Sequence, residues 1–308
     1  MRGKNIIRRA LGLALGLSVV LTGCKVAGAD GEVYGRASAS PPSDGPANEG
    51  YVATPAVAVT PSAPAVPVTF AEAEALYFER RYSEAEDWFA SYVVERPENA
   101  WGHYMLGLSA WKAGDPGIAE TALTRALEID PDHGKSRLNL TRVLLEAGRP
   151  EEALDHASLA VDLDSTSGEA HRLFARALAD LGEVTDAIIA FRRAVSLDDQ
   201  DVWALNNLGL LLIGEDQTSQ ALGPLARAVG LRPGVAVFHN NLGMALERCG
   251  YFGAATDQYR LAVESDSTHQ KAAANLGRIE GRQDRPGLPE LDLPALGREF
   301  FEETRREP

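Results

Sequence analysis

Three histidines recur at equal spacing, and imidazole is a common metal ligand and proton-transfer group. His103, His171 and His239 lie 68 residues apart. This spacing predicts that each occupies the same place in a different structural unit, so the three rings lie far apart and do not bind one ion. The sequence also lacks H-E-x-x-H, C-x-x-C, phosphate-loop and G-x-S-x-G motifs. We therefore expect no metal, no cofactor and no enzymatic activity.

The units that position these histidines are 34 residues long. Alanine returns at this interval without slippage, at Ala85, Ala119, Ala153, Ala187, Ala221 and Ala255. The corresponding frames are 66–99, 100–133, 134–167, 168–201, 202–235 and 236–269, with a partial frame at 270–284. A fixed period of this length indicates one supersecondary unit that is copied and stacked.

Each frame has the pattern of a helical hairpin. Apolar residues at positions 4, 7, 8 and 11 form one face of a first helix, and those at 20, 24 and 27 form one face of a second. Small residues at positions 8, 20 and 27 allow close approach of the two helices. Glycine at position 15 is expected to end the first helix, and proline at position 32 to follow the second; they occur at Gly114, Gly148, Gly182 and Gly250, and at Pro97, Pro131 and Pro233.

This pattern resembles the tetratricopeptide repeat over residues 66–284. The resemblance implies an all-α, right-handed superhelical solenoid of about six hairpins that binds protein partners or extended peptides. Residues 285–308 form a proline-rich tail in which a short helix near Ala295–Arg305, with Phe300 and Phe301, is expected to cap the last repeat. Cys249 aligns with small or apolar residues of other frames and is expected to be buried.

The resemblance also predicts which residues face a peptide-binding groove on the first helices. They are Trp101, Tyr104, Leu108, Trp111, Lys135, Asn139, Arg142, Arg172, Arg176, Trp203, Asn206, Asn207, Leu210, Asn240, Asn241, Met244, Asn275 and Arg278. The amides at position 6 of their frames resemble the asparagine ladder of peptide-binding repeats, although they could instead bond locally. The aromatic residues form a binding anchor or pack between repeats, and the arginines form a basic spot for a carboxylate.

The pattern of the first 67 residues predicts an export signal followed by a tether. Residues 1–23 have a basic start and an uncharged run, and they end in Leu21-Thr22-Gly23-Cys24. This resembles a bacterial lipobox, which implies cleavage before Cys24 and acylation of that cysteine; the alternative is an ordinary secretory signal. Lys25 after the cysteine resembles the outer-membrane sorting pattern. Residues 24–67 are rich in proline, alanine and serine and predict a disordered tether.

The net charge of the chain limits the classes of binding partner. The whole chain has a net charge of −14, and removal of the four basic residues of the signal segment would leave −18. This balance argues against nucleic acid and against flat binding to anionic lipid. We expect a lipid-anchored scaffold in the cell envelope, facing the periplasm from the outer membrane, with protein partners and no small-molecule substrate. It resembles pilotin-type and tight-adherence (Flp) pilus assembly lipoproteins; the alternative is a scaffold for cell-wall or exopolysaccharide enzymes.

Overall fold

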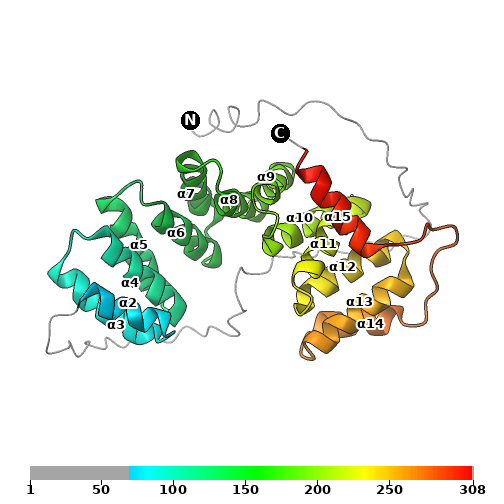
Figure 1. The fold of residues 1–308 in the computed structure, drawn as a ribbon, viewed down its shortest axis with the longest axis horizontal. Coiled ribbons are helices and arrows are strands. Elements are labelled where there is room, and N and C mark those ends of the chain that lie inside the picture. Colours follow the sequence, from blue (N-terminus) through cyan, green and yellow to red (C-terminus); the bar gives the residue numbers. More distant parts are fainter. Residues whose placement is uncertain (1–68, 307–308) are drawn as a thin grey trace. The chain divides into compact units, whose positions relative to one another are not determined.

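The computed structural model describes residues 69–306, which all belong to one compact unit. These residues form fourteen helices and no strand (Figure 1). Six consecutive hairpins are α2 (Phe70–Phe78) with α3 (Tyr82–Glu95), α4 (Ala100–Ala113) with α5 (Pro116–Ile129), α6 (Gly134–Glu146) with α7 (Pro150–Leu163), α8 (Gly168–Asp180) with α9 (Val184–Leu197), α10 (Val202–Gly214) with α11 (Thr218–Leu231), and α12 (Ala236–Cys249) with α13 (Phe252–Ser265). Helix α14 (Gln270–Ile279) and helix α15 (Leu293–Thr304) follow. The predicted all-α solenoid of stacked hairpins is confirmed.

Small residues hold the helices of each hairpin together, as the sequence predicts. All six repeat alanines are fully buried. A Cβ atom at Gly107 would lie 2.6 Å from Cγ of Leu123, and one at Gly209 would lie 2.4 Å from Cγ of Leu225. Any larger side chain at these two positions would therefore force the paired helices apart.

The turn inside each hairpin uses one left-handed residue at position 15 of the frame. Gly114, Gly148 and Gly182 take φ values of 96°, 69° and 80° there. Arg80 and Asp216 occupy the same position in frames without the glycine, and they too have positive φ, at 62° and 58°. The repeat geometry therefore imposes this conformation on non-glycine residues, at a cost of about 1 kcal/mol each.

The histidines at position 4 have structural partners. Nε2 of His103 lies 3.0 Å from the carbonyl oxygen of Pro97, and Nε2 of His239 lies 2.7 Å from that of Pro233. His171 makes the same contact with Ser165 at 3.1 Å. Each ring therefore joins a first helix to the turn that precedes it. No group of three metal-ligating side chains occurs among residues 69–306.

The tail helix α15 lies elsewhere than predicted. It packs against α11 in the fifth hairpin rather than against α14 at the end of the solenoid (Figure 1). The reason is the surface of α11: Gly223 leaves room for Phe300, whose Cβ lies 2.8 Å from where a Cβ at Gly223 would be. On α15, a Cβ atom at Gly297 would lie 3.2 Å from the backbone nitrogen of Arg227.

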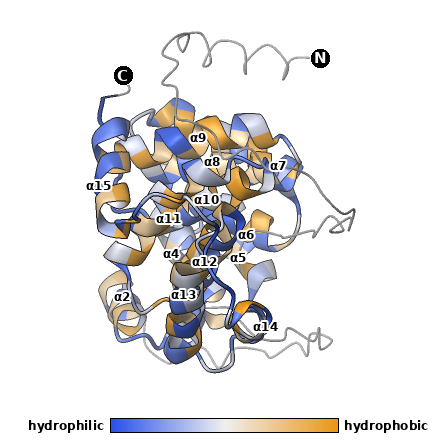
Figure 2. Ribbon diagram, turned by 90° about the vertical axis from the view of Figure 1, so that its right-hand side faces the viewer, coloured by the Kyte–Doolittle hydropathy of each residue, from blue (hydrophilic) through white to orange (hydrophobic). Residues whose placement is uncertain are grey.

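Figure 2 shows hydrophobic and hydrophilic residues mixed along α15, as a helix with one buried face requires. Phe300 is buried, and Leu293 and Leu296 pack against the core formed by the fourth to sixth hairpins. Cys249 is buried in that core, as predicted. Within the described range, no helix is long and apolar enough to cross a membrane. Cys24, the signal segment and the tether lie outside the described residues.

Candidate functional site

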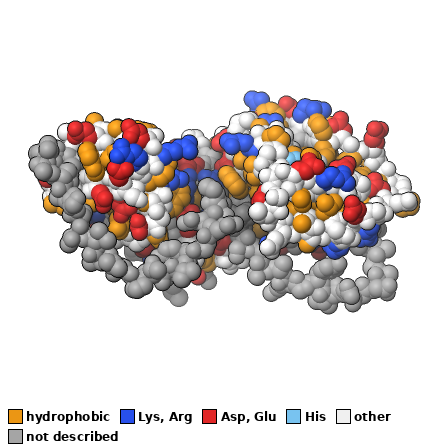
Figure 3. Space-filling model, turned by 90° about the horizontal axis from the view of Figure 1, so that it is seen from below, with side chains coloured by type: hydrophobic (Ala, Val, Ile, Leu, Met, Phe, Trp, Pro, Cys, Tyr) orange, Lys and Arg blue, Asp and Glu red, His pale blue; other side chains and the backbone are white. Residues whose placement is uncertain are grey.

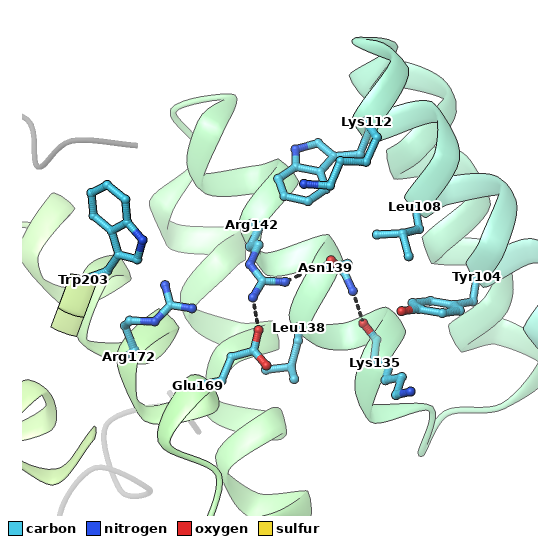
Figure 4. A pocket seen from close by; sticks show the side chains of 11 residues that line it. Tyr104, Leu108, Lys112, Lys135, Leu138, Asn139, Arg142, Glu169, Arg172 and Trp203 are labelled. Atoms are coloured by element: carbon cyan, nitrogen blue, oxygen red, sulfur yellow. Dashed lines mark hydrogen bonds and ion pairs between the residues drawn. The ribbon is translucent and has the colours of Figure 1, made fainter. Parts of the chain in front are cut away.

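The first helices of neighbouring hairpins line a hollow of about 410 Å³. Helices α4, α6, α8 and α10 contribute its walls (Figure 4). The lining residues are Tyr104, Leu108, Trp111, Lys112, Lys135, Leu138, Asn139, Arg142, Glu169, Arg172 and Trp203. Eight of them belong to the predicted groove set, whose role in binding a peptide stays a prediction. On the face of the molecule shown in Figure 3, by contrast, basic and acidic side chains are interspersed.

Aromatic residues at the start of α4 pack against the next hairpin. The Trp101 ring lies edge-on to Tyr104 at 5.6 Å and edge-on to His133 at 4.7 Å. Tyr104 is buried, whereas 49% of Trp101 remains exposed. The pKa of the Tyr104 hydroxyl is raised because burial disfavours its anion. Tyr104 therefore serves packing between repeats, and Trp101 also presents a broad apolar surface to solvent.

Trp111 connects the end of α4 to α6. Its Nε1 donates a hydrogen bond to Oε2 of Glu146 at 2.7 Å. The ammonium of Lys112 lies over the Trp111 ring, 4.1 Å from its centre. Burial, together with the nearby Arg142, lowers the pKa of Lys112. The hollow thus has an aromatic wall with a cation held against it.

Arg142 is the central cation of the hollow. It forms an ion pair with Glu169, and its Nη1 donates to Oδ1 of Asn139 at 3.0 Å (Figure 4). The amide nitrogen of Asn139 donates to the carbonyl oxygen of Lys135 at 2.9 Å. Asn139 therefore bonds locally and fixes the arginine.

Arg172 is also held by a carboxylate of the protein itself. Its Nε donates to Oδ2 of Asp201 at 2.7 Å, and only 9% and 11% of the two side chains are exposed. The other oxygen of Asp201 accepts the backbone N–H groups of Trp203 and Ala204, so it caps α10. Arg176 is 4% exposed and does not line the hollow. Of the predicted basic spot, Arg142 and Arg172 line the hollow and are both paired, whereas Arg176 is buried outside its lining.

The asparagines of the last hairpins bond to one another in a directed series, which we call the amide relay. Asn275 donates to Asn240 at 3.0 Å, Asn240 to Asn241 at 3.2 Å, Asn241 to Asn206 at 2.8 Å, and Asn206 to Asn207 at 3.4 Å. Nδ2 of Asn207, at its end, has no hydrogen-bond partner among the described residues. Four of the five side chains are at most 4% exposed, all but Asn275. The relay therefore joins α10, α12 and α14, and a role of these amides in binding a peptide stays a prediction.

The remaining groove residues extend this surface towards α14. Trp203 lies edge-on to Phe238 at 5.2 Å. Arg278 forms an ion pair with Glu247, which also accepts a hydrogen bond from the Tyr259 hydroxyl at 2.9 Å. The pKa of Tyr259 is raised by burial and by this carboxylate. Two further predicted members are half-buried: Leu210 and Met244.

Three charged residues in or beside the hollow were not predicted from the sequence. Glu169 stands at position 2 of its frame, and Lys112 and Glu146 stand at position 13 of theirs. These positions belong to the groove set that the resemblance implies, so the same frame could have selected all three. Asp201 is different, because it precedes α10 at the last position of a frame and acts through its helix cap.

Comparison with known proteins agrees with this geometry. Two tetratricopeptide repeat family models match residues 104–168 and 144–208. Residues 104–208 are therefore similar to tetratricopeptide repeats. Matching solved structures support the fold alone. This chain aligns with the APC/C hetero-tetramer Cut9–Hcn1 at a TM-score of 0.62 and 16% identity, over 68% of this chain and 42% of that one.

Two bacterial structures match over nearly their whole length. The C-terminal part of a repeat protein from Cytophaga hutchinsonii aligns at a TM-score of 0.52 and 14% identity, over 70% of this chain and 96% of that one. A repeat protein of Thermus thermophilus aligns at 0.50 and 18%, over 59% and 98%. No curated protein matches the sequence of this chain.

Proposed function

We propose that this tetratricopeptide protein is a lipid-anchored scaffold that holds an extended segment of a partner protein in the hollow along α4, α6, α8 and α10. The observation that carries this proposal is the lining of the hollow, where Trp111 and Trp203 accompany four cations. Aromatic and arginine side chains are the residue types that most often dominate protein binding. Tetratricopeptide repeats are scaffolds suited to protein–protein interaction, which supports the same reading.

The proposal also includes a lipid anchor in the membrane and a role in assembly. Leu21-Thr22-Gly23-Cys24 supports acylation of Cys24, and Lys25 supports sorting to the outer membrane. There the scaffold would serve the assembly of a pilus or a secretion system. Labelling of cells with a fatty-acid analogue should mark the wild type and leave the Cys24→Ser variant unmarked; labelling of that variant would refute the anchor.

Site-specific crosslinking tests the binding surface. A photoreactive amino acid at Trp101 should capture the partner in native membranes, because 49% of that residue is exposed and its ring contacts Tyr104 and Lys135, which line the hollow. The matched control is the same amino acid at Leu159 on α7, which is 48% exposed and does not line the hollow. Pilus or secretion proteins captured only from Trp101 would support the proposal. Capture of polysaccharide enzymes alone would overturn the assembly role, and equal capture from both sites would overturn the binding surface.

A further inference from the structure

The hollow is a basic region on an acidic protein. Its lining includes the cations Lys112, Lys135, Arg142 and Arg172 and the carboxylate of Glu169. Two more carboxylates lie against this lining, Asp201 on Arg172 and Glu146 on Trp111, so four cations face three carboxylates. The chain as a whole has a net charge of −14. Lys112 interacts electrostatically with Glu146, and the ammonium of Lys135 lies over the Trp101 ring, 5.3 Å from its centre. The local charge therefore favours an anionic occupant over a neutral or basic one.

Glu169 already provides one such anion from the protein itself. It lies in the first turn of α8, its side chain is 41% exposed, and its carboxylate pairs with Arg142, which is only 16% exposed. The N-terminus of a helix stabilises a nearby carboxylate whether or not an arginine is bound to it. Glu169 therefore remains stabilised after it leaves Arg142, but the largely buried guanidinium then needs another carboxylate in its place. Asn139 keeps that guanidinium in position through its own hydrogen bond.

We infer that Glu169 is an internal competitor that occupies the place of a carboxylate side chain of the partner, and that the partner segment is an acidic polypeptide. This inference rests on the proposed function of the hollow. On binding, an aspartate or glutamate of the partner replaces Glu169 on Arg142. Further acidic residues along the same segment reach Lys112 and Lys135, which lie on either side of Asn139 and Arg142 in Figure 4. Glu169 thereby excludes weakly acidic segments that cannot displace it.

The test compares the binding of labelled decapeptides to the full-length protein by fluorescence anisotropy at low ionic strength. One probe alternates glutamate and alanine, and the other alternates glutamine and alanine. The variants are Glu169→Gln and the control Glu152→Gln. Glu152 carries the same charge and pairs with Arg149 on the exposed side of α7, outside the hollow.

We expect the glutamate peptide to bind the wild type more tightly than the glutamine peptide, with an affinity that falls as salt is added. Glu169→Gln should raise the affinity for the glutamate peptide about fivefold, whereas Glu152→Gln should change it less than twofold. An unchanged or lower affinity of Glu169→Gln would overturn the inference, provided that its thermal melting matches the wild type. Tighter binding of polygalacturonate than of the peptide would overturn the choice of a polypeptide.

Failure of the inference can be told from failure of the proposed function. If both peptides bind equally and Trp111→Ala abolishes their binding, the hollow binds peptides but does not select acidic ones. If neither peptide binds the wild type or Glu169→Gln while crosslinking from Trp101 still captures a partner, the function stands and the competitor role is refuted. If neither assay finds binding at the hollow, both proposals fall.

Discussion

Replacement of Asn206 by alanine should lower the free energy of unfolding of the C-terminal hairpins by about 2–4 kcal/mol. Asn206 is fully buried; it accepts from Asn241 at 2.8 Å and donates to Asn207 at 3.4 Å. Its loss leaves the buried donor of Asn241 unsatisfied, which costs about 1–3 kcal/mol. The longer bond to Asn207 and the lost packing of the side chain account for the rest.

The position of an asparagine in the relay sets the expected size of the effect. Asn275 is half-buried at the donor end and bonds to one member of the relay, so Asn275→Ala should cost about 0.5–1 kcal/mol. In a double-mutant cycle, Asn206→Ala and Asn241→Ala should couple by at least about 1 kcal/mol. Asn206→Ala and the exposed Thr121→Ala on α5 should show no coupling.

Hydrogen exchange measured by mass spectrometry is the suitable assay, because stacked repeats do not unfold as one cooperative unit. Asn206→Ala should speed the exchange of α10 and α12 and leave α4 and α6 unchanged. A loss below about 0.5 kcal/mol, or equal losses for Asn206→Ala and Asn275→Ala, would refute the reasoning that the relay is a buried network whose members stabilise one another.

Two further predictions concern a titrating carboxyl group and the tail helix. Burial, together with the nearby carboxylate of Asp115, raises the pKa of Glu86 from 4.5 to about 7. Between these pH values the folded state holds a proton that the unfolded chain has released. The free energy of unfolding should therefore rise as the pH falls from about 7 to 4.5. Glu86→Gln should therefore melt at a higher temperature than the wild type at pH 8 and at nearly the same temperature at pH 5, and a constant difference between these pH values would contradict the shift. On α11, Gly223→Ala should displace α15 because its Cβ would lie 2.8 Å from that of Phe300, whereas Gly230→Ala has open space around it and should stabilise the helix by about 0.5–1 kcal/mol. Limited proteolysis between residues 281 and 292 should be faster in Gly223→Ala alone, and equal rates in both variants would show that α15 is held by other contacts.

The hairpins could be predicted from the sequence because the residues that determine each hairpin lie within one frame. A small residue at position 8 meets a side chain of the next helix, and Gly114 ends α4 with its own backbone. Arg80 and Asp216 replace the glycine in their frames and still have a positive φ, because the surrounding hairpin determines the turn.

The site could be predicted as a surface but not as a set of contacts. The frame placed Arg142 and Arg172 on one face, yet their partners Glu169 and Asp201 belong to the following helices. Such bonds depend on rotamers and on the stacking distance between hairpins, which no single frame encodes. The location of α15 escaped prediction for a related reason, since Phe300 contacts Gly223, far away in the sequence.

The relay also determines how this solenoid could be lengthened. Asn241 is a donor to the preceding hairpin, and Asn240, beside it, is an acceptor from the following one. A tandem duplication of residues 236–269 would therefore bring its own donor and its own acceptor. The asparagines of the copy would then extend the relay, each with a hydrogen-bond partner. Arg172 occupies the corresponding place in α8 and offers no acceptor, so growth by this route is open towards the C-terminus and closed before α10.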